Sequence, residues 1–171
     1  MIEVGQKFPS VTIKQATAEG GADVNTGELF AGKKVVIFAL PGAFTPTCSQ
    51  KHLPGFVAQL PQLKAKGVDI VACLSVNDAW VMKAWAEQHD ALGKIVMLSD
   101  GAGALTKALG IELDLTKAGM GVRAQRGMII VEDNVVKSVD MEAPGKFEVS
   151  SAEACMMKLG YRWRARCSIE F

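Results

Sequence analysis

The chain has 171 residues, which suits a single domain that removes about 70% of its unfolded surface from water. Its 19 basic and 18 acidic residues leave a formal charge of +1, so no general attraction to nucleic acid or to an anionic membrane is expected. No apolar run approaches the roughly 18 residues that span a bilayer, and the first residues do not read as a secretory signal. We therefore expect a cytoplasmic protein that acts on a small molecule or on another protein.

The first half of the chain alternates between strand-like and helix-like segments. Residues 11–14 alternate as a short exposed strand and residues 19–23 are turn material, which together predict an N-terminal β-hairpin. The segments that follow are expected in this order: a strand at 35–40, a helix at about 48–66, a strand at 69–75, a helix at about 78–89 and a strand at 95–98. Strands that alternate with helices in this way predict a parallel core sheet.

The second half of the chain adds antiparallel strands to this plan. A short helix near residues 103–109 is expected to end at Gly110, because glycine is favoured just past a helix end. The dipeptide at 133–134 is Asp-Asn, which predicts a tight hairpin between apolar strands at 127–132 and 135–141. The central sheet is therefore predicted to be mixed, with helices on its flanks.

A last helix is expected over about 150–159, because Ser150 or Ser151 can cap its N-terminus together with Glu153. We interpret residues 1–159 as one α/β domain. Residues 160–171 show neither helical nor strand periodicity, so they are interpreted as an unstructured tail, either a natural extension or an expression remnant.

The most informative motif follows the strand at 35–40, where residues 41–49 read Pro-Gly-Ala-Phe-Thr-Pro-Thr-Cys-Ser. The two prolines and the glycine stop the strand and force a turn, so Cys48 is expected in the first turn of the next helix. Unpaired backbone N–H groups and the helix dipole favour a thiolate there. A helix N-terminus supplies at best about 2 kcal/mol, so a cation and a hydroxyl donor such as Thr45 are also needed.

This motif resembles the active-site loop of the type II, or 5-type, peroxiredoxins. The resemblance covers roughly residues 2–159 and continues through five further segments: 51–56, 75–78, 82–85, 110–114 and 147–152. It implies a thioredoxin-like fold and assigns the chemistry to Cys48, Thr45, Pro41 and Arg126. Thr45 could instead be a simple N-cap, and Arg123 could support Arg126.

The resemblance implies a thiol-dependent peroxidase that reduces hydrogen peroxide and alkyl hydroperoxides through a sulfenic acid on Cys48. It implies glutaredoxin, glutathione or thioredoxin as the reductant, a homodimer, and no metal, haem or flavin cofactor. A thioredoxin-like disulfide oxidoreductase is disfavoured because Lys51 stands where its second cysteine belongs. A peroxide sensor or holdase, which would use the same cysteine without turnover, is the other alternative.

The four cysteines, at positions 48, 73, 155 and 167, form no C-x-x-C pair and have no zinc-finger spacing. Cys73 lies 25 residues after Cys48, a spacing found in plant type II relatives, and is the candidate resolving cysteine. It also lies in a buried-looking strand, and a disulfide requires Cα atoms within about 7 Å. We therefore favour an external thiol, with Cys155 as a poorer internal candidate.

Three other features allow two interpretations each. His52 lies four residues after Cys48 on the same helical face, which is also the spacing of a Cys/His hydrolase, but no third orienting group is evident. Trp85 is interpreted as a core residue. Phe44 and Trp80 are expected either in the core or at a dimer interface beside the active-site loop.

Overall fold

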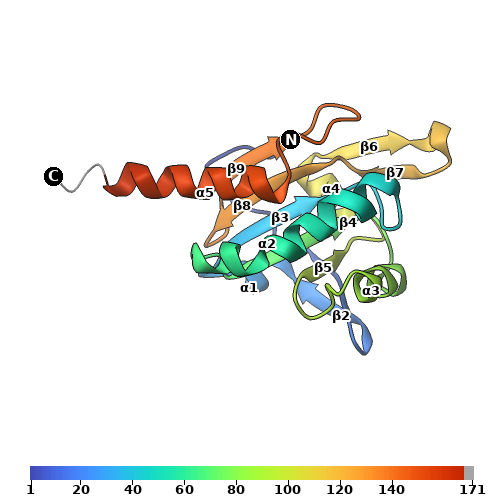
Figure 1. Cartoon of the computed structure of the whole chain (residues 1–171). Helices are drawn as coiled ribbons and strands as arrows, with labels where there is room; N and C mark the ends of the chain where they lie inside the picture. The colour runs from blue at the N-terminus through green and yellow to red at the C-terminus, as the bar shows by residue number, and fades with distance from the viewer. Residues whose placement is uncertain (168–171) are drawn as a thin grey trace.

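The protein is built on one seven-stranded mixed sheet, seen in a computed structural model that describes residues 1–167, with side chains for residues 1–160 (Figure 1). The strands of this sheet are β1 (Thr12–Thr17), β2 (Gly20–Asn25), β3 (Lys34–Ala39), β4 (Ile70–Ser75), β5 (Val96–Ser99), β8 (Gly127–Glu132) and β9 (Val135–Met141). Their order is β2-β1-β5-β4-β3-β8-β9. The core strands β3, β4 and β5 are parallel, and the outer pairings are antiparallel. The predicted mixed sheet and N-terminal hairpin are confirmed.

Helices cover both faces of this sheet, which gives three layers and two apolar cores. The helices are α1 (Thr26–Phe30), α2 (Leu53–Ala65), α3 (Ala79–Gln88), α4 (Ala104–Leu109) and α5 (Ala152–Cys167). Alternate residues of β3 point to opposite faces, as strand geometry requires. Phe38 packs with residues of α2, α3 and α5, whereas Ile37 packs with residues of α1 and α4. Both side chains are fully buried, so β3 lies at the centre of the fold.

A helix forms at the expected position, but the turn that carries Cys48 is not α-helical. Residues Cys48–His52 form a π-helical turn, η1, and the backbone N–H of Leu53 donates to the carbonyl of Cys48. The regular helix α2 begins at Leu53, with Pro54 in its first turn, where the missing proline N–H costs no helical hydrogen bond. Single π turns inside helices are frequent at functional sites, and this one carries the cysteine.

The turns of the second half follow the prediction. Gly110 ends α4 with φ of 69°, a conformation that favours glycine. Asp133 and Asn134 both have positive φ, 46° and 63°, as a two-residue hairpin between β8 and β9 requires.

Other elements also differ from the prediction. β2 includes residues 20–23, which were expected in the turn of the hairpin. Hydrogen bonding to β1 keeps these largely exposed residues in a strand. A small second sheet of β6 (Glu112–Leu115) and β7 (Gly121–Ala124), joined through the 3-10 turn η2 (Thr116–Ala118), was not predicted. Its strands have only four residues each, which is the lower limit of length for a strand pattern.

The expected end of the last helix was wrong. The helix α5 continues to Cys167, so residues 160–167 are helical where an unstructured tail was predicted, and residues 168–171 lie outside the described part. This segment lacks an apolar stripe, but Arg and Ala are strong helix formers and one internal glycine costs only about 1 kcal/mol.

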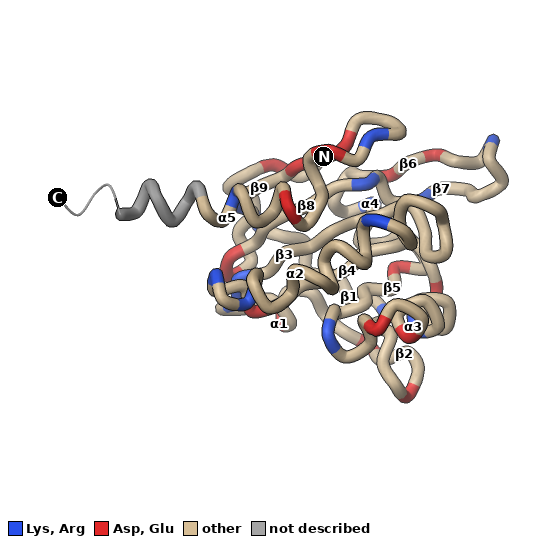
Figure 2. The backbone as a smooth tube through the Cα atoms, in the orientation of Figure 1, with Lys and Arg blue, Asp and Glu red and all other residues tan. Residues whose placement is uncertain are grey.

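The distribution of charged residues and the polarity of the helices agree with the expectations from the composition. Basic and acidic residues are interspersed over the described chain in Figure 2, as the near-zero net charge suggests. In the described residues, every helix is too short or too polar to cross a membrane.

Candidate active site

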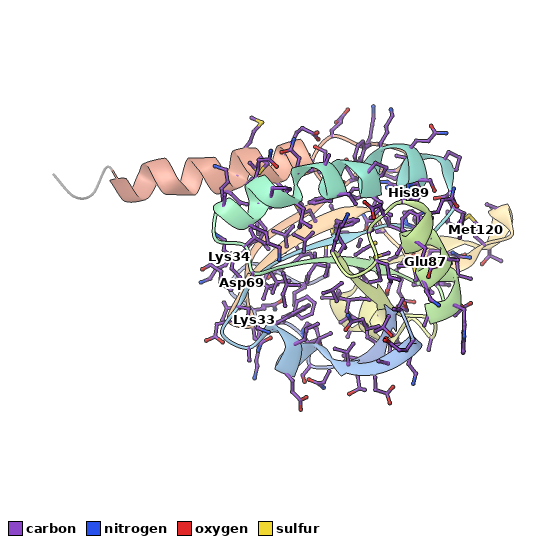
Figure 3. All side chains as sticks on the ribbon, turned by 60° about the horizontal axis from the view of Figure 1, so that its bottom comes forward. Lys33, Lys34, Asp69, Glu87, His89 and Met120 are labelled. Atoms are coloured by element: carbon purple, nitrogen blue, oxygen red, sulfur yellow. The ribbon has the colours of Figure 1, made fainter. Side chains whose placement is uncertain are left out.

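The active-site loop lies at the carboxyl end of the parallel strands, where α/β sheets commonly place their ligands. β3 begins at Lys34, whose backbone N–H donates to Asp69 at 2.8 Å. In Figure 3 both residues lie at one end of the molecule and Met120 lies at the other. A side-chain carbon built on Gly42 would come within 3.6 Å of Met120, so the loop after β3 lies at that second end.

Arg126 meets the predicted nucleophile directly. The Nη2 group of Arg126 donates a hydrogen bond to Sγ of Cys48 at 3.1 Å. The register of β3 and β8 explains this contact, because Ala39 pairs with Gly127 and thereby brings Arg126 beside the loop that leaves β3. Cys48 is fully buried, so this donor approaches the sulfur away from bulk water, where charge-assisted hydrogen bonds are strong. The structure thus brings Arg126, the cation that the resemblance to peroxiredoxins implies, to the sulfur of Cys48.

Thr45 is close in sequence, but its hydroxyl points elsewhere in this structure. Its Oγ1 donates to the carbonyl of Gly42 at 2.7 Å, so the expected hydrogen bond from Thr45 to the sulfur is not made. Residues 46 and 47 are already helical, so Thr45 stands at the N-terminal boundary of this helix, where its backbone carbonyl accepts a hydrogen bond from the N–H of Ser49 at 3.0 Å. With its proton committed to a carbonyl, the hydroxyl oxygen of Thr45 keeps lone pairs free to accept.

Pro41 contributes its backbone as well as its ring. Its carbonyl accepts a hydrogen bond from Nη1 of Arg123 at 3.2 Å, and Nε of Arg123 donates to the carbonyl of Met120 at 2.8 Å. The same Nη1 lies 2.8 Å from where a Cβ on Gly42 would sit, so a larger residue there would displace this end of the Arg123 side chain. Arg123 therefore supports the loop, while Arg126 contacts the sulfur.

His52 uses both ring nitrogens within the protein. Its Nδ1 lies 2.9 Å from Nη1 of Arg126, and its Nε2 lies 2.9 Å from the carbonyl oxygen of Ser150. Burial, together with the charge of Arg126, lowers the pKa of His52 to about 3. A histidine engaged in this way is not free to act as a general base on Cys48, which removes the Cys/His hydrolase interpretation.

A pocket of about 520 Å³ leads to this cluster. Pro41 and Arg126 line it together with Leu113 and Leu115 of β6 and with Phe147, and the guanidinium carbon of Arg126 lies 5.9 Å from the centre of the Phe147 ring. The sequence analysis did not identify this wall. Its signal is the alternation of Leu113 and Leu115 with the acidic residues between and before them.

The loop that carries Phe147 is anchored by one carboxylate. Oε1 of Glu142 accepts hydrogen bonds of 2.8 Å from the backbone N–H groups of Glu148, Val149 and Ser150 and from the Ser150 hydroxyl. Burial alone would raise the pKa of the Glu142 carboxyl, but these hydrogen bonds outweigh it and lower the pKa. The ionised carboxylate therefore fixes one rim of the pocket.

The other described cysteines lack such partners. Cys73 lies in the middle of β4, fully buried, and its pKa is raised well above the usual value by burial and by the neighbouring Cys48. Burial and the charge of Asp140 raise the pKa of Cys155 in α5 to about 12. Cys48, Cys73 and Cys155 are all free thiols.

The aromatic residues separate into core and surface. Trp85 is fully buried, as predicted, and its Nε1 donates to the hydroxyl of Ser49 at 3.0 Å. Phe44 is 51% exposed and Trp80 is 75% exposed, so neither is a core residue. Phe44 also has a φ of 64°, which is strained for a bulky side chain.

Comparisons with known proteins agree with this geometry. The redoxin family model matches residues 3–156. Chloroplastic peroxiredoxin-2E of Arabidopsis thaliana is 48% identical over 163 residues, which cover 92% of this chain and 69% of that protein. Chloroplastic peroxiredoxin-2E-2 of Oryza sativa subsp. japonica is 49% identical over 164 residues, with coverage of 92% and 72%. The crystal structure of reduced Prx3 from Vibrio vulnificus in complex with H2O2 superposes with a TM-score of 0.88 at 53% identity, covering 93% of this chain and 99% of that one.

Proposed function

This chain belongs to the peroxiredoxin family and is a thiol-dependent peroxidase with a thioredoxin-like fold, and we propose that Cys48 is the thiol that attacks the peroxide. The observation that carries this proposal is the 3.1 Å hydrogen bond from Arg126 to the sulfur of Cys48. A guanidinium in that position stabilises negative charge on the sulfur, and the reactive form of a cysteine is its anion. Among Cys48, Cys73 and Cys155, only Cys48 has a cationic hydrogen-bond partner on its sulfur.

The reaction proposed for Cys48 is a two-electron oxidation of its sulfur. The thiolate attacks the terminal oxygen of R–O–OH, an S–O bond forms as the O–O bond breaks, and the leaving RO⁻ takes up a proton to give an alcohol or water. Arg126 stabilises the negative charge that moves from sulfur to oxygen. The hydroxyl of Thr45 donates its hydrogen to the Gly42 carbonyl, so its oxygen can accept a hydrogen bond from the peroxide O–H and orient the substrate.

The pocket supports organic hydroperoxides as substrates in addition to hydrogen peroxide. Its volume of about 520 Å³ exceeds what one peroxide molecule fills, and the side chains of Leu113, Leu115 and Phe147 give it an apolar wall. An alkyl hydroperoxide whose alkyl group binds against this wall would place its peroxide oxygens toward Arg126.

For the second half of the cycle we favour an external thiol. A thiol RSH condenses with the sulfenic acid of Cys48 to give a mixed disulfide and water, and a second thiol then releases Cys48 as the thiol. Cys73 is a poor resolving group because β4 holds its backbone between β3 and β5, opposite Phe38 and Met97. Glutaredoxin with glutathione is therefore the proposed reductant, with thioredoxin as the alternative.

A steady-state assay tests both the activity and the reductant. Peroxide consumption is measured with glutaredoxin and glutathione, with glutathione alone and with thioredoxin, each against an alkyl hydroperoxide and hydrogen peroxide. We expect turnover with glutaredoxin and glutathione. Oxidation of Cys48 without turnover in every system would instead support a sensor, and reduction of insulin would support a disulfide oxidoreductase.

We also propose a homodimer that buries Phe44 and Trp80. The two exposed aromatic residues belong to neighbouring segments, because the backbone N–H of Ala43 donates to Oδ1 of Asn77 at 3.0 Å. A strained and exposed phenylalanine beside a catalytic loop is best explained by a partner surface. Sedimentation of wild type and Phe44→Asp tests this at micromolar concentration: the wild type is expected to be a dimer and the variant a monomer. An unchanged dimer in the variant contradicts the proposed interface.

A further inference from the structure

One arginine joins the proposed nucleophile to a buried histidine. Arg126 donates with Nη2 to Sγ of Cys48 at 3.1 Å and with Nη1 to Nδ1 of His52 at 2.9 Å. Both nitrogens belong to one rigid, planar guanidinium, so a partner that fixes Nη1 also fixes the direction of Nη2. His52 and Cys48 both belong to the π turn η1, which presents them to the same guanidinium.

The hydrogen bonds of His52 determine its tautomer. Nε2 lies 2.9 Å from the carbonyl oxygen of Ser150, and a carbonyl can only accept, so Nε2 carries the hydrogen. Nδ1 is then an unprotonated acceptor that faces Arg126. Burial and the nearby guanidinium, which together lower the pKa of His52 to about 3, keep the ring neutral at physiological pH.

The ring of His52 packs against three aromatic rings. Its centre lies 5.1 Å from the ring of Phe38, 5.7 Å from that of Phe56 and 5.0 Å from that of Phe147. The residue that receives its Nε2–H, Ser150, is itself held by the Glu142 carboxylate through its backbone N–H and its hydroxyl. A continuous set of contacts therefore runs from the pocket rim to the cysteine.

We propose that His52 is a positioning residue for peroxide reduction, which accepts from Arg126 through Nδ1 and so holds the second amino group of that arginine on Cys48. This inference rests on the proposed role of Cys48. It assigns a specific role to one ring nitrogen. Nδ1 must be an acceptor, because an N–H at that position could not accept a hydrogen bond from the guanidinium. The bond to Ser150 has a separate task, which is to hold the ring in this tautomer.

A pair of substitutions separates the two ring nitrogens. His52→Asn places an amide oxygen near the position of Nδ1 and lacks the reach to Ser150, whereas His52→Gln reaches toward Ser150 and gives up the acceptor at Nδ1. His52→Phe keeps the ring and removes both hydrogen bonds. The readout is the second-order rate of Cys48 oxidation in a single turnover, followed by fluorescence, because Trp85 contacts Ser49 next to the cysteine.

We expect His52→Asn to stay within about tenfold of the wild-type rate and His52→Gln and His52→Phe to lose about 10²-fold, the cost of a misplaced reacting group. Circular dichroism and thermal melting show whether each variant is folded. A residue that merely ties the helix to Ser150 would give the opposite order. A rate for His52→Gln equal to or above that of His52→Asn therefore overturns the proposal.

A measurement on the wild-type protein does not depend on the variants. The chain has only two histidines, so ¹⁵N-histidine labelling gives two sets of ring-nitrogen signals, which His89→Gln assigns. We expect His52 to be the neutral tautomer with hydrogen on Nε2 at neutral pH, and hydrogen on Nδ1 would overturn the proposal. This result is independent of turnover, so a failure of the proposed peroxidase function would appear separately, as a wild-type protein that consumes no peroxide.

Discussion

Cys48 and Cys73 make an instructive comparison, because they are equally buried yet differ in everything that controls reactivity. Both are fully inaccessible and belong to the same apolar cluster. Cys48 lies in the helical turn that follows the loop after β3 and receives a hydrogen bond from Arg126. Cys73 lies within a strand, where burial raises its pKa and keeps it a thiol. A cationic donor, rather than exposure, therefore separates the reactive cysteine from the structural one.

The backbone around each cysteine explains why they differ. In β4, Cys73 pairs with Phe38 on one side and with Met97 on the other, so its position is fixed by the sheet. Cys48 lies in a π turn, which departs from the regular helical hydrogen-bond pattern and leaves room for Arg126 to approach. The same apolar core thus contains an unreactive thiol, Cys73, and a second one, Cys48, that lies beside the guanidinium of Arg126.

The largest effect is expected from Cys48→Ser. The change from sulfur to oxygen is nearly isosteric, but the serine hydroxyl stays protonated at neutral pH and cannot attack the peroxide. Peroxide consumption should fall to the background rate while the thermal melting temperature changes little. Retention of most of the wild-type peroxidase rate by this variant would show that another thiol, such as Cys73, does the chemistry.

The next effect concerns the two arginines beside the loop. Arg126→Gln removes the donor on the sulfur and should slow Cys48 oxidation by about 10² to 10³-fold, as loss of a transition-state donor does. Arg123→Gln is the matched control, since Arg123 donates to backbone carbonyls of Pro41 and Met120 instead. Its loss should cost roughly tenfold or less through a looser loop.

Single-turnover rates and the pH dependence of alkylation by iodoacetamide check both arginine variants. The alkylation reports the thiolate fraction, which should fall in Arg126→Gln and stay close to wild type in Arg123→Gln. Equal losses in the two variants would contradict the assignment of Arg126 as the direct partner of Cys48.

Much of the fold around the site could be predicted because it depends on short stretches of neighbouring residues. The apolar run at 35–40 predicts β3, the prolines of the loop predict the break after it, and Asp133 and Asn134 predict the hairpin of β8 and β9. The resemblance to peroxiredoxins supplied Arg126, which no periodicity identifies. The contact between Arg126 and Cys48 joins residues 78 positions apart, and only the register of β3 and β8 brings them together.

The features that were missed depend on turn geometry or on contacts between residues far apart in the chain, which local sequence patterns do not show. The hydroxyl of Thr45 had two reachable acceptors, and the turn geometry gave it to Gly42. His52 was noted for its spacing from Cys48, but its hydrogen-bond partners Arg126 and Ser150 lie 74 and 98 residues away. The π turn was also missed, because the residues of Cys48–His52 are compatible with an α-helix.

The smallest effect is expected from Cys73→Ser, and it tests the comparison most directly. If Cys73 is a core residue, its substitution should leave turnover with glutaredoxin and glutathione within about twofold and lower the free energy of unfolding by about 1 to 3 kcal/mol, because a buried hydroxyl lacks a partner. Cys155→Ser, in a second buried cysteine, is the matched control and should behave alike. Peptide mapping after one equivalent of peroxide completes the test. A sulfenic acid or glutathione adduct on Cys48 is expected, whereas a disulfide between Cys48 and Cys73 would require the π turn to unwind and would make Cys73 the resolving cysteine.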